Sequence, residues 1–156
     1  MRGKPAKKRI LEPDSKFGSV TVSKLINYVM ERGKKTVAAR ITYNALDQAA
    51  AQLKSQPLIV LEQAVKNTSP LIEVRSHRIG GANYQVPIEV SKNRRLALSL
   101  RWIIQAAKSK KGQQMSTKLS HEIIEAFNNQ GSAVKKKDDT HKMAESNKAF
   151  AHFAKH

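Results

Sequence analysis

Two short segments of the chain alternate between apolar and polar residues on either side of a glycine pair, Gly80-Gly81. The alternation covers residues 72–77 and 84–90, and a period of two is typical of β-strands. Gly80, Gly81 and Asn83 tolerate the positive φ angles that a tight turn requires. The pattern therefore predicts a β-hairpin at about residues 72–90. A two-stranded hairpin is marginal in water by itself, so this one needs support from elsewhere.

The rest of the chain has helical periodicity. We expect Gly33 to cap the end of a first helix, Pro57 to begin a third and Ser132 to be the N-cap of a sixth. Trp102 is expected in the core with the apolar faces of the first five helices, and the alternative is an exposed indole that stacks on a base. The predicted helices cover about 20–33, 37–53, 57–68, 92–109, 115–128 and 132–148. The predicted fold is mainly α, a bundle of about six helices with one protruding two-stranded β-hairpin between the third and fourth helices.

The sixth predicted helix has a weaker apolar pattern than the others. Val134, Met143, Ala144 and Phe150 do not form a continuous stripe, so we expect a peripheral helix that docks mainly by charge. No linker divides the chain into two domains. The expected organisation is a basic flexible arm at 1–18, a helical bundle with its hairpin at 19–150, and a C-terminal tail at 151–156.

The chain carries a large excess of positive charge. It has 29 Lys and Arg against 12 Asp and Glu, a formal net charge of +17 in 156 residues. No acid occurs between Glu89 and Glu122, or before Glu12. Such a charge repels itself and favours a polyanionic partner, with nucleic acid as the first expectation. That partner is also the expected support for the hairpin.

Motifs typical of enzymes are incomplete. Gly33-Lys34-Lys35 resembles the end of a phosphate-binding loop, but Tyr28 stands where the first glycine belongs and Lys35 replaces the magnesium-binding hydroxyl residue. His121-Glu122 begins a helical zinc motif whose second histidine is missing. There is no cysteine, and the five histidines lack metal-ligand spacing. We therefore expect no catalysis, no metal and no cofactor.

Basic residues are spread over the arm, a loop, the hairpin, a helix start and a late run. This dispersion suits a folded RNA better than the single recognition helix of many DNA-binding proteins. Arg94 and Arg95, where the hairpin meets a helix, are expected to contact phosphate and not to support the fold. The candidate RNA-binding residues are Lys4, Lys7, Lys8, Arg9, Lys34, Lys35, Arg75, Arg78, Arg94, Arg95, Arg101, Lys108, Lys110, Lys111, Lys135, Lys136, Lys137, His141 and Lys142.

Several motifs together resemble one family over essentially the whole chain beyond the first ten residues. They are Pro13–Ser19, Gly33–Lys35, Arg78–Gly81, Tyr84–Pro87, Arg101-Trp102, Gly131–Lys136 and Met143–His152, in this order. The chain is similar to the bacterial-type small-subunit ribosomal protein seven. The resemblance implies a helical bundle with a protruding hairpin, in agreement with the periodicity.

The resemblance also implies partners. It implies primary binding to the 3′ major domain of 16S-type rRNA, nucleating assembly of the subunit head, near the tRNA exit site and the mRNA exit path. Small-subunit ribosomal proteins nine and eleven are the implied neighbours. The implied location is the ribosome in a bacterial cytoplasm, or in an organellar matrix or stroma. The hairpin-tip residues implied to face exit-site tRNA are Ile79, Gly80, Gly81, Ala82, Asn83 and Tyr84.

Two other classes of partner bear on this expectation. A basic architectural DNA-binding protein is the alternative, and competition between duplex DNA and structured rRNA separates the two. No apolar run approaches the length of a membrane span, so no membrane partner is expected.

Overall fold

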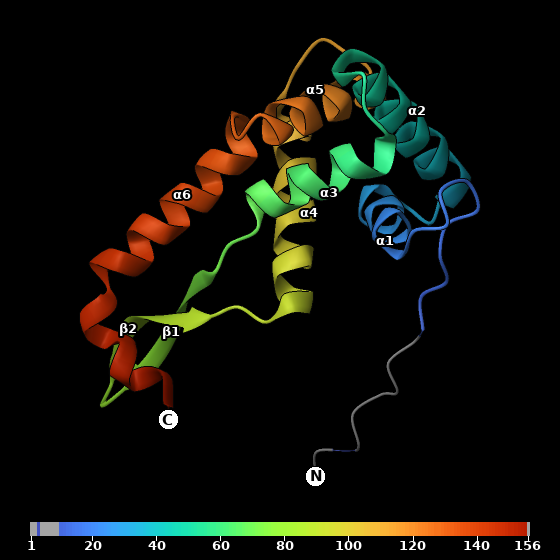
Figure 1. Cartoon of the computed structure of the whole chain (residues 1–156). Helices are drawn as coiled ribbons and strands as arrows, with labels where there is room; N and C mark the ends of the chain where they lie inside the picture. The colour runs from blue at the N-terminus through green and yellow to red at the C-terminus, as the bar shows by residue number, and fades with distance from the viewer. Residues whose placement is uncertain (1–2, 4–9, 156) are drawn as a thin grey trace.

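The computed structural model describes Gly3 and residues 10–155 of the chain. Within this part, six α-helices and a C-terminal 3-10 helix accompany one β-hairpin (Figure 1). The elements are α1 (Val20–Val29), α2 (Lys35–Leu53), α3 (Pro57–Thr68), β1 (Ile72–Ile79), β2 (Ala82–Glu89), α4 (Lys92–Ser109), α5 (Met115–Phe127), α6 (Gly131–Ser146) and η1 (Lys148–Lys155). The predicted fold, mainly α with a hairpin between the third and fourth helices, is confirmed.

Helix α5 lies at the centre of the bundle and contacts α2, α3, α4 and α6. Its residues Leu119, Ile123 and Ala126 are fully buried, and their spacing of three and four places them on one helical face. Trp102, expected in the core, is only half-buried and packs at its margin. The largest side chains around α5 with no exposed surface are Leu25, Leu46, Leu61, Leu100 and Ile103.

Two predicted helix ends are wrong. Helix α1 ends at Val29, and Gly33 instead lies at a φ of +75° in the turn that leads to α2. Helix α6 begins at Gly131, so Ser132 is not its N-cap. The backbone N–H of Ala133 in its first turn donates to Glu122 Oε1 of α5 at 3.0 Å. The acceptor that the local sequence placed on a serine is thus a buried carboxylate of the preceding helix, α5.

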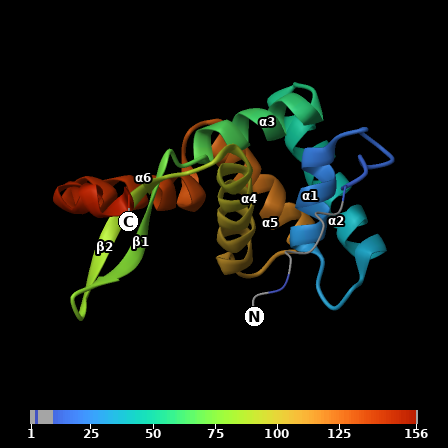
Figure 2. The same ribbon diagram turned by 90° about the horizontal axis from the view of Figure 1, so that it is seen from below.

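The hairpin has the predicted position and turn. Its strands pair antiparallel from Ile72 opposite Glu89 to Ile79 opposite Ala82. Gly80 and Gly81 have φ angles of +55° and +90°, which glycine adopts without steric cost. The hairpin extends away from the bundle, on the side opposite α1 and α2 (Figure 2).

Other segments of the chain support the hairpin. The charge had suggested that a nucleic acid would provide this support. Helix α6 packs against β1, and η1 packs against β2. The Tyr84 ring of β2 lies 5.2 Å from that of Phe150 and 5.5 Å from that of Phe153, between centroids. Helix η1 therefore forms part of the hairpin's packing, and its red ribbon lies beside the two strands in Figure 1.

Helix α6 docks through apolar residues as well as polar ones, so the expectation of docking mainly by charge is wrong. Ala133, Val134 and Ala144 are buried, whereas Met143 remains exposed. The apolar pattern of α6 is weak because two of its three buried apolar residues are alanines. Small side chains let the helix approach α4 and α5 closely, yet they add little to a hydrophobic pattern.

Replacing Phe150 and Phe153 together with alanine should loosen the hairpin while the bundle stays folded. Aromatic contacts contribute about 0.5–1.5 kcal/mol each beyond their burial, so amide exchange in β2 should accelerate by about tenfold. Hydrogen–deuterium exchange measures this. Met143→Ala, at an exposed position of α6, is the control and should change nothing. Unchanged exchange in the double variant would show that η1 does not hold the hairpin.

Candidate nucleic-acid interface

The candidate basic residues of the described chain fall into two groups. One group is exposed, and no hydrogen bond or ion pair joins these side chains to another described residue. It comprises Lys34, Lys35, Arg78, Arg101, Lys111, Lys135, Lys136 and Lys142. The other group is bonded within the protein and comprises Arg75, Arg94, Arg95, Lys108, Lys110, Lys137 and His141. Lys4, Lys7, Lys8 and Arg9 lie outside the described residues.

One end of the bundle concentrates free lysines on two neighbouring loops. Lys34 and Lys35 lie where the turn after α1 enters α2, and Lys111 lies between α4 and α5. A hollow of about 450 Å³ separates these elements and has Lys34, Lys108 and Lys118 on its walls. Sequence reasoning missed Lys118 as a site residue. Its position three residues after Met115, on the helix that follows the basic loop, is the signal that could have identified it.

Lys108 binds Glu31 across this hollow. The hydrogen bond from Lys108, then its charge, holds the pKa of the Glu31 carboxyl below its ordinary value. Both side chains are exposed, and exposed ion pairs contribute little to stability. Lys108 can therefore exchange Glu31 for a phosphate at small cost.

Lys110 has a different environment, although it is two residues away. Its ammonium lies 3.0 Å from Glu122 Oε2 and 2.9 Å from Glu125 Oε1. Glu122 is fully buried, and its other oxygen binds the first turn of α6. Partial burial alone would lower the pKa of Lys110, but the hydrogen bonds that its ammonium donates to Glu125 and Glu122 outweigh burial and raise the pKa. Lys110 is therefore a charged structural residue joining α4, α5 and α6.

Arg75 and Arg94, both candidate RNA-binding residues, share one buried carboxylate. Glu73 of β1 is 7% exposed, and it accepts hydrogen bonds from Arg75 and, at 3.1 Å, from Arg94 Nε. Arg95 Nε donates to the Val90 carbonyl at 2.8 Å. These bonds tie the hairpin to the start of α4. Arg94 and Arg95 were not expected to support the fold. Their hydrogen bonds within the protein give both of them a structural role.

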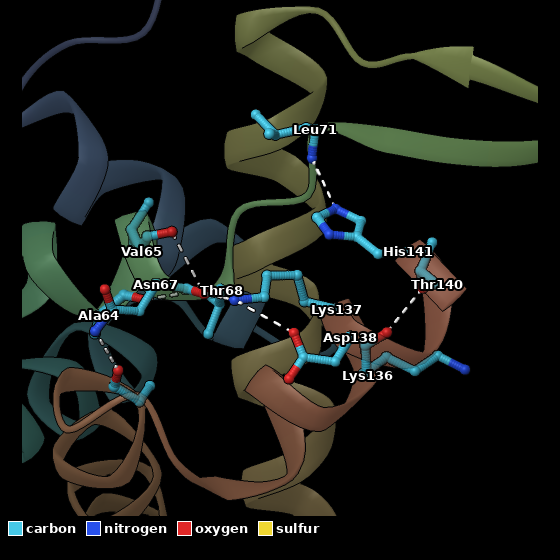
Figure 3. Close-up of polar contacts among 11 residues, drawn as sticks. Ala64, Val65, Asn67, Thr68, Leu71, Lys136, Lys137, Asp138, Thr140 and His141 are labelled. Carbon is cyan, nitrogen blue, oxygen red and sulfur yellow. Dashed lines mark hydrogen bonds and ion pairs between the residues drawn. The ribbon is translucent and has the colours of Figure 1, made fainter. Parts of the chain in front are cut away.

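Lys137 and His141 join α6 to the last turn of α3 and to the connection that leads from it to β1 (Figure 3). Lys137 Nζ donates to the Asn67 carbonyl at 2.8 Å, and His141 Nε2 accepts from the Leu71 backbone N–H at 3.1 Å. The Asn67 amide in turn donates to the carbonyls of Ala126 and Phe127 at the end of α5. On one side of α6, Lys137 and His141 therefore bind other parts of the protein.

The other side of α6 faces solvent. Lys135, Lys136 and Lys142 are exposed, as is Arg78 near the end of β1. Arg101 of α4 lies over the Tyr28 ring, with 5.5 Å between the guanidinium carbon and the ring centroid. At the hairpin tip Gly80, Gly81, Ala82 and Asn83 are exposed, whereas Ile79 and Tyr84 are half-buried.

Residues 10–155 contain neither a metal site nor a membrane-spanning helix. No three His, Asp or Glu side chains gather there in a way that could hold a metal ion. None of the helices there is both long and apolar enough to cross a bilayer. The basic surface is thus the main feature of this part of the chain that could bind a ligand.

Comparison with known proteins decides which family these features belong to. The sequence profile of the family described as ribosomal protein S7p/S5e matches residues 1–148. The chain belongs to this family. The small ribosomal subunit protein uS7 of Thermotoga maritima is 56% identical over 153 residues, covering 98% of this chain and 99% of the relative. The uS7 of Dictyoglomus turgidum is 54% identical over 149 residues, or 96% of each chain.

Membership of the S7p/S5e family makes the chain a ribosomal protein of the small subunit, a structural component and not an enzyme. The relatives from Thermotoga maritima and Thermotoga neapolitana, at 56% and 54% identity, are bacterial ribosomal proteins, so its location is the ribosome in the cytoplasm. The predicted family is confirmed.

Replacing Lys110 or Lys111 with alanine should separate structural from RNA-binding lysines. Lys110→Ala leaves buried Glu122 without its cation and should cost about 1–3 kcal/mol in the free energy of unfolding. Lys111→Ala, at an exposed position, should change stability by less than about 0.5 kcal/mol but weaken binding to rRNA. Chemical denaturation and filter binding measure the two effects. Equal stability of the two variants would contradict the assignment.

Proposed function

We propose that this S7p/S5e-family protein binds the 3′ major domain of small-subunit rRNA directly and nucleates assembly of the subunit head. Lys and Arg side chains supply most of the affinity by releasing counterions from phosphates. The bundle fixes the positions of those charges, so only RNA folded into the matching shape meets them all.

The single observation that carries this proposal is the spread of free cations over separate elements. Lys34 and Lys111 lie on loops at one end of the bundle, whereas Lys135 and Lys142 lie on α6 and Arg78 on the hairpin. The elements that carry these residues, the two loops, α6 and the hairpin, lie in different parts of the molecule rather than on one helix (Figure 1). A duplex read by one recognition helix would not reach them together, whereas a folded RNA can.

The hairpin is the proposed contact with tRNA at the exit site, beside the path of mRNA and near small-subunit proteins nine and eleven. The family resemblance provides this assignment. Its physical support is that the tip projects from the bundle and has exposed glycine backbone, which a ligand can approach closely (Figure 2).

Affinity for a transcript of the rRNA 3′ major domain should depend steeply on salt. With about six to ten phosphate contacts, binding should weaken by about 10³ or more between 50 and 200 mM salt. Filter binding across this range measures the slope. A nearly flat dependence would contradict a mechanism based on phosphate contacts.

Competition with duplex DNA provides the control for RNA specificity. An excess of duplex DNA of the same length should displace little of the transcript, because the dispersed cations fit the folded RNA. Equal competition by the duplex would favour the alternative, a basic architectural DNA-binding protein.

Deleting Gly80–Asn83 and closing the strands with a short turn should change the behaviour of tRNA and not of rRNA. The tip is exposed and lies outside the bundle core, so folding and incorporation into subunits should persist. Tyr84 is retained because it packs against Phe150 and Phe153. The dissociation rate of deacylated tRNA from the exit site of programmed ribosomes measures the effect, and it should rise.

Two outcomes would contradict this division of roles. An unchanged tRNA dissociation rate with normal assembly would show that the tip does not act on tRNA. Loss of assembly would show that the hairpin anchors rRNA instead.

A further inference from the structure

A small hollow lies between α4 and α6, apart from the lysine-rich hollow at the end of the bundle. Its volume is about 250 Å³. Trp102, Gln105, Ala106 and Ser109 line it from α4, and Ser132 and Lys136 line it from α6. The indole of Trp102 is half-buried, so it is held in place by the core while part of it remains accessible.

Three polar side chains of this hollow have no partner in the described part of the fold. Among the described residues, none is hydrogen-bonded to the Trp102 indole N–H, the Gln105 amide or the Lys136 ammonium, and Gln105 and Lys136 are exposed. The Ser109 hydroxyl donates to the Ala106 carbonyl at 2.7 Å, which leaves its oxygen able to accept a hydrogen bond. No acid lines the hollow, whereas Glu12 and Asp14 line one larger hollow of the molecule and Glu31 lines another.

This combination matches one ligand chemistry. A nucleobase has a flat π-face and edges that both donate and accept hydrogen bonds, and proteins bind unstacked bases on aromatic side chains. A side-chain amide and hydroxyls satisfy the edges of a base, and a lysine neutralises the attached phosphate. An acidic peptide would use the lysine but leave the indole face and the amide without partners.

We propose that this hollow holds one unpaired nucleotide of the bound RNA, with its base on Trp102 and its phosphate at Lys136. Gln105 and the two serines contact the edge of the base. This site rests on the proposed rRNA binding and adds to it an element that reads a single unpaired base, since phosphate contacts carry no sequence information.

The indole itself reports on the site because Trp102 is the only tryptophan in the chain. Titrating the full chain with a transcript of the 3′ major domain should quench its fluorescence in parallel with binding. Trp102→Leu should weaken binding by about 5- to 150-fold, the range for one stacked base. Trp102→Phe, which keeps a ring in the hollow, should restore most of the affinity.

Lysine variants test the phosphate contact without touching the core. Lys136→Gln should reduce the slope of log affinity against log salt by about one. Lys66→Gln, which removes an equal charge from an exposed position on α3, should leave the slope unchanged. Since Lys136 is exposed, this pair remains informative even if Trp102→Leu fails to fold.

A photoreactive benzophenone side chain at position 105 then identifies the occupant in reconstituted small subunits. A crosslink to one unpaired rRNA nucleotide is the expected result. A crosslink to another protein would overturn the nucleotide site. Tight binding of the transcript with unchanged fluorescence and equal affinities of the Trp102 variants would overturn this site alone. Failure of the wild-type chain to bind the transcript would overturn the proposed function as well.

Discussion

The buried carboxylate of Glu122 connects the parts of the molecule that carry its positive charge. One oxygen accepts the Ala133 N–H at the start of α6, and the other binds Lys110 at the end of α4. A buried charge is tolerated only when it is paired and hydrogen-bonded, so this carboxylate requires all three helices in place. The exposed lysines of α6 therefore have a fixed position relative to those at the other end of the bundle.

The same division between structural and exposed cations recurs along the chain. Arg94 neutralises buried Glu73, and Lys137 holds the carbonyl of Asn67. Their neighbours in sequence, such as Lys135 and Lys136, face solvent without a partner among the described residues. A chain of net charge +17 thus uses part of its positive charge to fix the geometry. The other lysines and arginines are exposed to solvent, where an external polyanion can bind them and offset their mutual repulsion.

The hairpin and the C-terminal segment form a second unit that depends on this geometry. Helix α6 carries η1 to the hairpin, where Phe150 and Phe153 contact Tyr84. An isolated two-stranded hairpin is marginal, so these contacts and the Glu73 ion pairs stabilise an element that has no third strand beside it among the described residues. The tip can then project without losing its orientation, as the proposed contact with tRNA requires.

The helical and strand periodicities, the hairpin turn at Gly80-Gly81 and the excess of positive charge are local or summed properties of the residues, so they could be predicted from the sequence. It also carried the family motifs. Tertiary structure decided which cations remain free: Lys110 and Lys111 are neighbours, yet only Lys110 reaches buried Glu122. It also decided the cap of α6 and the support of the hairpin. These depend on side chains that are distant in sequence and meet only after the helices pack, so no local pattern contains them.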